Sequence, residues 1–114
     1  MLATAAAAAE RDDFVLHCAG CHKFDGSGSE VVPALDEIGA VFALEGGGRQ
    51  YIGRVPGVAQ APLNDERLAA LLNWLLGEFG QTTARPAYSA DEVRQLRAQP
   101  LRDPIAARKV LFGE

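Results

Sequence analysis

The two cysteines and two histidines of the chain are concentrated in one short segment, and this clustering constrains the fold more than any other feature. Cys18, Cys21 and His22 lie within five residues of one another, and His17 directly precedes them. The chain has 114 residues, of which 12 are glycine and 6 are proline. A chain of this length and composition forms one compact domain with a modest core. We therefore expect interactions beyond side-chain packing to help hold it together.

The clustered residues form a recognisable motif. Residues 18–22 are Cys-Ala-Gly-Cys-His, the C-x-x-C-H pattern typical of covalent attachment of c-type haem. Two cysteines three positions apart at the end of a helical turn can each add to one vinyl group of the same porphyrin. The residue that follows then presents an imidazole to the iron. The sequence therefore predicts one covalent haem c attached to Cys18 and Cys21, with His22 as an axial ligand of the iron.

Three other roles compete for the same segment. A disulfide across so short a loop would add little stability. A thioredoxin-like redox pair needs a βαβ context, and no strand is expected before residue 18. A structural zinc site needs four ligands, and only His17 lies nearby as a fourth. Haem attachment is favoured over these three roles because it also accounts for the position of the histidine.

The rest of the sequence shows helical spacing of apolar residues and no sustained alternation typical of strands. Asn64 is a favourable N-cap, and leucines at helical spacing follow it, which predicts a helix from residue 65 to about residue 76. Shorter helices are expected over residues 10–19, 36–44 and 49–55, and two more after the capping residues Ser89 and Asp103. These patterns predict an all-α fold.

Composition divides the chain into three expected parts. Residues 1–9 are almost all alanine and are expected to be a leader remnant or a disordered tail, with a frayed helix start as the alternative. Residues 10–80 contain the motif and the strongest helix, and are expected to form the haem domain. Residues 81–114 are expected to be a helical extension that either packs back over this domain or docks on a larger enzyme.

The charge and hydropathy of the chain exclude two classes of protein. The net charge is −4, whereas a nucleic-acid-binding protein needs a basic face. No apolar run approaches the roughly 18–20 residues needed to cross a bilayer. We therefore expect neither a nucleic-acid partner nor a transmembrane segment.

Residues 10–79 resemble the class I c-type cytochromes. In that family a short helix runs into the haem motif, and an aromatic residue eight positions before the axial histidine packs against the last core helix. Phe14 stands at that position relative to His22. Residues 47–52 are similar to the third helix of the family, and residues 62–76 are similar to its last core helix. The resemblance implies a class I cytochrome c-like helical fold around one covalently bound haem.

The resemblance also implies further residues around the cofactor. In the family a proline about a dozen residues after the axial histidine offers its carbonyl to the imidazole N–H. Pro33 stands eleven residues after His22. Arg49 and Arg54 are expected to pair with the haem propionates, and Tyr51 is expected to lie against the haem. Trp74 is expected to pack beside Phe14 as filler between helices.

The sequence departs from the family at the second axial ligand. Family members supply a methionine from the loop before the last helix, but the one methionine here is Met1. Within the expected loop at residues 57–63, Val58 stands near the methionine position. We therefore expect a haem without methionine ligation and a lowered reduction potential. The sixth position is open, filled by water or taken by another side chain, for which the candidates are His17, Lys23, Tyr51, Gln60 and Lys109.

These expectations lead to a function. A small haem c domain is expected to transfer single electrons, as a carrier or as the electron-accepting subunit of a redox complex, and to have no catalytic residues of its own. Its partner is expected to be a redox protein, such as a dehydrogenase or a larger cytochrome. The alternative is a haem protein with an open sixth site, performing peroxidase-like chemistry or sensing small ligands. Covalent haem attachment implies a periplasmic or equivalent extracytoplasmic location.

Overall fold

The structure, a computed structural model, describes residues 5–30 and 32–114 of the chain. Within these residues all regular structure is helical, with eight α-helices, one 3-10 turn and no strand. The prediction of an all-α fold is therefore confirmed. In the same residues every helix is too short or too polar to cross a lipid bilayer.

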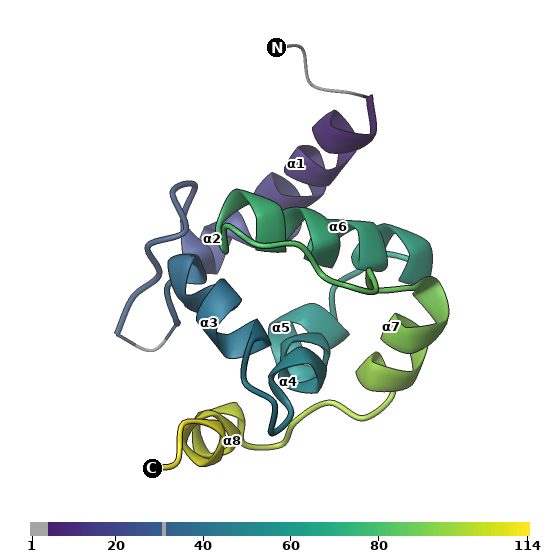
Figure 1. Cartoon of the computed structure of the whole chain (residues 1–114). Helices are drawn as coiled ribbons and strands as arrows, with labels where there is room; N and C mark the ends of the chain where they lie inside the picture. The colour runs from purple at the N-terminus through teal and green to yellow at the C-terminus, as the bar shows by residue number, and fades with distance from the viewer. Residues whose placement is uncertain (1–4, 31) are drawn as a thin grey trace.

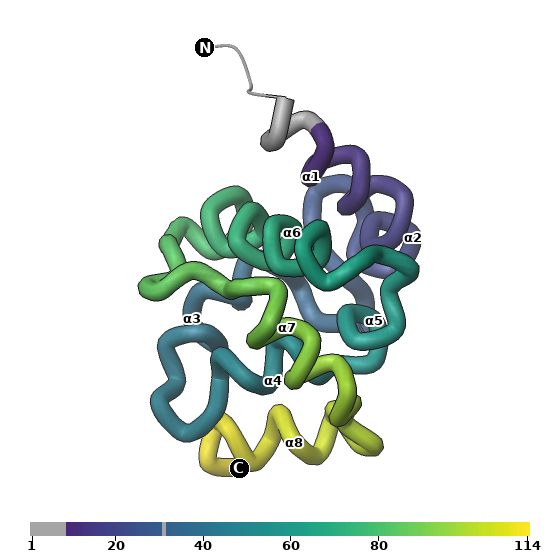
Figure 2. Tube along the Cα trace, turned by 90° about the vertical axis from the view of Figure 1, so that its right-hand side faces the viewer, coloured from purple at the N-terminus to yellow at the C-terminus, as the bar shows by residue number. Residues whose placement is uncertain are grey.

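Two groups of helices form the molecule (Figure 1). The longest helix, α6, lies beside α1, and the short helices α3, α4 and α5 lie across the molecule from them. Helix α7 connects the two groups on one side, and α8 lies at the far end from α1 (Figure 2). In chain order the elements are α1 (Ala5–His17), α2 (Ala19–His22), the 3-10 turn η1 (Leu35–Glu37), α3 (Ile38–Phe42), α4 (Gly48–Arg54), α5 (Pro56–Ala59), α6 (Asp65–Glu78), α7 (Ala90–Arg97) and α8 (Pro104–Leu111).

Helix α6 is the centre of the core, and local sequence explains why it forms. The Asn64 side chain accepts a hydrogen bond of 2.8 Å from the backbone N–H of Arg67, which caps the first turn. The leucines at helical spacing are all buried: Leu68, Leu71, Leu72, Leu75 and Leu76. The helix continues through Gly77 to Glu78, two residues beyond the predicted end. Phe79 follows as its C-cap, and its ring packs against the aromatic side chain of Phe14.

At the N-terminus the structure favours the alternative expectation, a helix start. Residues 1–4 of the expected leader or tail lie outside the described residues, but Ala5–Ala9 form the start of α1. Alanine has the highest helix propensity, so the alanine run extends the helix that carries Phe14.

Helix α5 was not expected, because residues 57–63 were expected to form a loop. Pro56 occupies its first turn, a position where the missing N–H of proline costs nothing.

Both predicted caps of the C-terminal extension are confirmed. Ser89 Oγ accepts from Glu92 N at 3.1 Å, and Asp103 Oδ1 accepts from Ala106 N at 3.0 Å. Helix α7 packs back against α6 and α4, and its Val93 is only 1% exposed. Of the two expected arrangements, α7 therefore adopts the one that packs over the preceding residues. The boundary at residue 80 stays a prediction.

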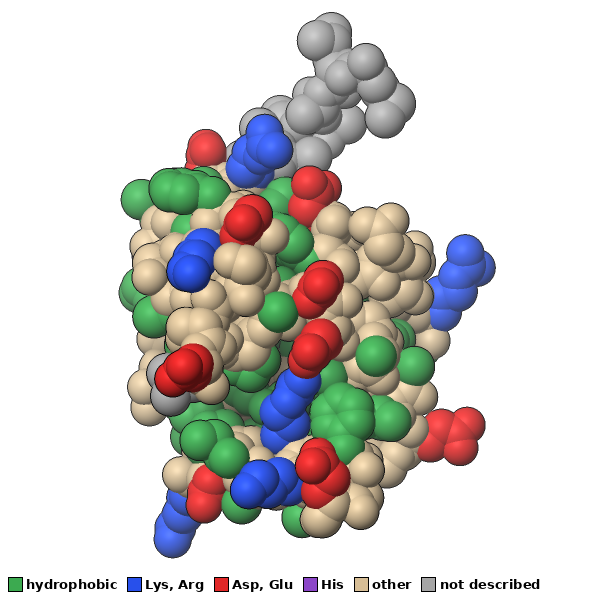
Figure 3. Space-filling model, turned by 90° about the vertical axis from the view of Figure 1, so that its left-hand side faces the viewer, with side chains coloured by type: hydrophobic (Ala, Val, Ile, Leu, Met, Phe, Trp, Pro, Cys, Tyr) green, Lys and Arg blue, Asp and Glu red, His purple; other side chains and the backbone are tan. Residues whose placement is uncertain are grey.

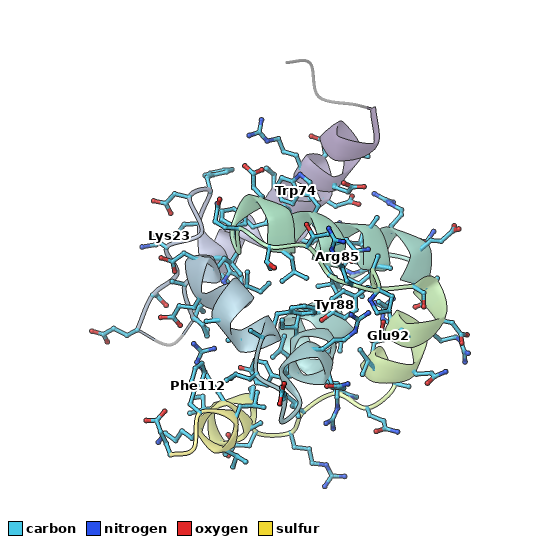
Figure 4. The ribbon with its side chains drawn as sticks, in the orientation of Figure 1. Lys23, Trp74, Arg85, Tyr88, Glu92 and Phe112 are labelled. Carbon is cyan, nitrogen blue, oxygen red and sulfur yellow. The ribbon has the colours of Figure 1, made fainter. Side chains whose placement is uncertain are left out.

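The linker before α7 is fixed to the core by Tyr88. The Asn73 side chain on α6 accepts from Tyr88 N at 2.9 Å and donates to Tyr88 O at 3.1 Å. The buried Tyr88 ring points toward the centre of the molecule (Figure 4), where its hydroxyl donates to the Arg49 carbonyl at 2.8 Å. One tyrosine therefore joins the extension to both α6 and α4.

Candidate functional site

The C-x-x-C-H motif occupies a single helical turn after a break in the chain direction. Helix α1 ends at His17, Cys18 has non-helical backbone angles, and α2 begins at Ala19. The sequence predicted that the helix would loosen at Gly20, two residues after the observed break at Cys18. His22 N donates to Cys18 O at 2.9 Å, and Cys21 N donates to the same oxygen at 3.2 Å. One carbonyl therefore organises the turn that carries both thiols and the imidazole.

The two thiols are free, and they differ in environment. Cys18 is half-buried and Cys21 is exposed, and no disulfide joins them. Burial, together with the nearby Asp13 and Cys21, raises the pKa of the Cys18 thiol to about 11. A catalytic redox cysteine has a depressed pKa because the thiolate is the nucleophile. The thiol of Cys18 therefore has the opposite of the property that a thioredoxin-like site requires.

The His22 imidazole is oriented by a backbone carbonyl. Its Nδ1 lies 3.0 Å from the carbonyl oxygen of Pro33, eleven residues away, as the resemblance implied. Nδ1 is the donor in this hydrogen bond, because a carbonyl can only accept, so Nε2 keeps its lone pair. Burial lowers the pKa of His22, and the hydrogen bond to Pro33 acts in the opposite direction. The neutral imidazole that burial favours is the form that binds metal ions.

The loop from residue 23 to residue 35 folds back to bring Pro33 to His22. Gly28 N donates to His22 O at 3.2 Å, and Leu35 N donates to Gly26 O at 2.7 Å. Both glycines have positive φ, 75° at Gly26 and 70° at Gly28, a conformation that other residues adopt at a cost. The loop between α2 and η1 is therefore tied to the motif by backbone hydrogen bonds at both ends.

Three aromatic rings hold α1, the helix that leads into the motif, against α6 and its C-cap. The Phe14 ring, four residues before Cys18, has its centroid 5.9 Å from Trp74 and 5.1 Å from Phe79. The predicted packing of Phe14 and Trp74 is therefore confirmed. Beside Phe14, the buried carboxylate of Asp13 accepts a hydrogen bond from Arg67 of α6. The orientation of α1, and hence of the motif that follows, is fixed by these contacts.

Arg49 and Arg54, expected to pair with haem propionates, have protein partners in this structure. Arg49 donates to the two carboxylate oxygens of Glu92 at 2.7 and 2.6 Å and to Pro86 O at 2.7 Å. Its guanidinium also lies over the Tyr88 ring, 4.5 Å from the centroid. Arg54 Nε donates to the carbonyl of Gln99 at 2.7 Å. Both arginines therefore hold the C-terminal extension. Pairing with the haem propionates stays a prediction, and it requires Arg49 to exchange the carboxylate of Glu92 for a propionate.

The remaining predicted residues are spread around the core. Tyr51 of α4 and Val58 of α5 are half-buried and pack against the core cluster. His17 is half-buried at the end of α1, whereas the side chains of Lys23, Gln60 and Lys109 are exposed. Met1 lies outside the described residues. Among the residues that are described, no group of three or more His, Cys, Asp or Glu side chains is arranged to hold a metal ion, so zinc binding gains no support.

Arg97, which no sequence pattern singled out, holds the segment of residues 59–65 in place through hydrogen bonds. The Arg97 guanidinium donates to the carbonyls of Ala59 at 3.1 Å, Ala61 at 2.6 Å and Leu63 at 2.8 Å, and to Asp65 Oδ1 at 3.1 Å. Helix α7 thereby fixes the connection between α5 and α6. No pattern in the sequence pointed to this role, because three of the four acceptors are backbone atoms.

One face of the molecule carries mixed charges. Acidic and basic side chains are interspersed with apolar ones on the face shown in Figure 3.

Comparison of the chain with models of known protein families, with curated proteins and with solved structures finds no match.

Proposed function

We propose that the chain is a monohaem c-type cytochrome of the class I type that transfers single electrons. The observation that carries this proposal is the geometry of one helical turn. It presents two uncommitted thiols, Cys18 and Cys21, and a histidine whose Nδ1 is held by the Pro33 carbonyl. The remaining nitrogen, Nε2, has the lone pair that an iron ligand requires.

The donor set fits the proposed cofactor. Cys18 and Cys21 would form the thioethers, and His22 would bind the iron with an imidazole already oriented by a second partner. A bound haem supplies reversible one-electron chemistry. Cys21 lies at the surface. A group attached there therefore has an edge close to solvent, as electron exchange with a protein partner requires.

The proposed partner is another redox protein, a dehydrogenase or a larger cytochrome. Assembly of a covalent haem supports a periplasmic or equivalent extracytoplasmic location.

Covalent attachment tests the proposal directly. Co-expressed with a haem-attachment apparatus, the protein is expected to gain the mass of one haem and to keep its pigment after denaturation and acid extraction. The Cys18→Ala/Cys21→Ala variant is expected to lose covalent pigment, because no thioether can form. Intact-mass measurement of both proteins decides the question. A wild-type chain with only the mass of its amino acids contradicts the proposal.

A second measurement concerns the sixth ligand. Val58 stands near the expected methionine position and cannot ligate iron, so the ferric protein is expected to lack the far-red absorption band of an iron–methionine bond. Optical spectra of the oxidised and reduced protein, with and without CO, test this expectation. Rapid CO binding favours an open site and the alternative function in ligand sensing, whereas slow binding favours a substitute side-chain ligand. Appearance of the far-red band contradicts the expectation.

A further inference from the structure

Gly28 contacts both residues of the hydrogen bond that orients the imidazole. Its backbone N–H donates to the carbonyl of His22 at 3.2 Å. A Cβ placed on Gly28 would lie 2.3 Å from the carbonyl oxygen of Val32 and 2.9 Å from the carbonyl carbon and oxygen of Pro33. The crowded oxygen of Pro33 is the same atom that accepts from His22 Nδ1.

The crowding at Gly28 cannot be relieved by a side-chain rotation. Every close atom belongs to the backbone, so a larger residue must displace the adjoining carbonyls of Val32 and Pro33. On either side of this peptide the loop is held by hydrogen bonds from Ser29 N to Val32 O at 2.8 Å and from Leu35 N to Gly26 O at 2.7 Å. A displacement therefore strains the hydrogen bond at Val32 O and moves the Pro33 carbonyl that directly follows it.

We propose that Gly28 is a positioning residue for the axial histidine. Because it lacks a side chain, the Pro33 carbonyl can approach Nδ1 of His22 closely enough to fix the plane of the ring and strengthen the donor character of Nε2. This inference rests on the proposed function, in which Nε2 binds the haem iron. A stronger imidazole donor stabilises the oxidised iron, so the position of Gly28 lowers the reduction potential.

Gly26 offers a matched control in the same loop. Its φ of 75° resembles that of Gly28, and an added Cβ would also be crowded. Its close contacts are two ring carbons of Phe79 at 2.8 Å and Leu35 Cβ at 3.2 Å, and the carbonyl of Pro33 is not among them. Substitution of Gly26 therefore imposes a similar backbone strain, but its closest contacts are side-chain atoms of Phe79 and Leu35 instead of that carbonyl.

The experiment compares haem-loaded wild type with the Gly28→Ala and Gly26→Ala variants after intact mass has verified attachment. Gly28→Ala is expected to raise the midpoint potential and to make exchange of the His22 Nδ1 proton, followed by NMR, roughly tenfold faster, as the loss of one hydrogen bond predicts. Gly26→Ala is expected to lower thermal stability but to leave the potential and the exchange rate as in wild type.

The Gly28→Asn and Gly26→Asn pair covers the case in which an alanine variant does not fold. Asparagine tolerates positive φ better than alanine but still carries a Cβ, so Gly28→Asn is expected to show the same shifts. An unchanged potential and exchange rate in a haem-loaded Gly28 variant overturns the role of Gly28. An equal shift in both members of a pair also overturns it, since backbone strain alone then explains the result. A wild type that carries no haem overturns the proposed function instead.

Discussion

Replacement of Phe14 by alanine is expected to lower the free energy of unfolding by about 3–5 kcal/mol, the usual cost of removing a buried phenylalanine. The Phe14 side chain is 3% exposed and lies against Trp74 and Phe79. Truncation removes these contacts and leaves a cavity between α1 and α6, which the backbone can fill only in part. Urea denaturation followed by circular dichroism measures the change.

Phe24 provides the matched control for this experiment. It is the same residue type, ten positions along the chain, but its side chain is 75% exposed. Phe24→Ala is therefore expected to change the free energy of unfolding by less than about 0.5 kcal/mol. Similar losses in the two variants would contradict the packing described for Phe14. The haem-loaded Phe14→Ala protein is also expected to lose more stability than Phe24→Ala, because Phe14 fixes the helix that leads into the motif.

Replacement of Arg97 by alanine is expected to lower the free energy of unfolding by about 2–4 kcal/mol, because several acceptors lose their donor together. Its guanidinium is mostly buried and serves three carbonyls and the carboxylate of Asp65. Water can replace part of these hydrogen bonds, which keeps the expected loss below the sum of the individual contacts. Denaturation in urea measures the loss, and hydrogen exchange of the amides between residues 57 and 65 shows whether it is local.

Two variants of α7 distinguish the hydrogen-bonding role of Arg97 from its charge. Arg97→Lys keeps the charge but replaces the planar fork with one ammonium group, so an intermediate loss is expected. Arg94→Ala removes an arginine whose ion-pair partner on the same helix is the exposed Asp91, and no resolvable loss is expected. A fully stable Arg97→Lys variant would show that charge alone suffices. Equal losses at positions 94 and 97 would show that removal of a positive charge from α7, rather than the carbonyl contacts, decides the effect.

Local signals in the sequence predicted local structure well. The caps at Asn64, Ser89 and Asp103 each act on a backbone N–H three residues away, so the sequence contains both partners of the interaction. The spacing of the leucines predicted which face of α6 is buried, because helical periodicity is also a property of the local sequence. The contact between Pro33 and His22 was expected because family resemblance supplied a partner that spacing alone would not have identified.

Interactions between distant elements were not predictable in this way. Arg49 and Glu92 are 43 residues apart, and nothing in either local sequence indicates that α4 and α7 meet. Arg97 bonds mainly to backbone carbonyls, which every residue possesses, so its role depends entirely on where α7 packs. The helical conformation of Ala5–Ala9 was only the alternative expectation, because an alanine run is compatible with both a cleaved leader and an extended helix.

The position of the Trp74 ring makes it a fluorescent probe of the contact between α1 and α6. It is the one tryptophan in the sequence, and its centroid lies 6.1 Å from that of Phe79 as well as beside Phe14. Its fluorescence therefore reports on a single place, the junction of α1 and α6, without an added label. A porphyrin attached a few residues beyond Phe14 would quench that emission by energy transfer. Recovery of fluorescence during unfolding then records the separation of the haem-bearing segment from the rest of the molecule.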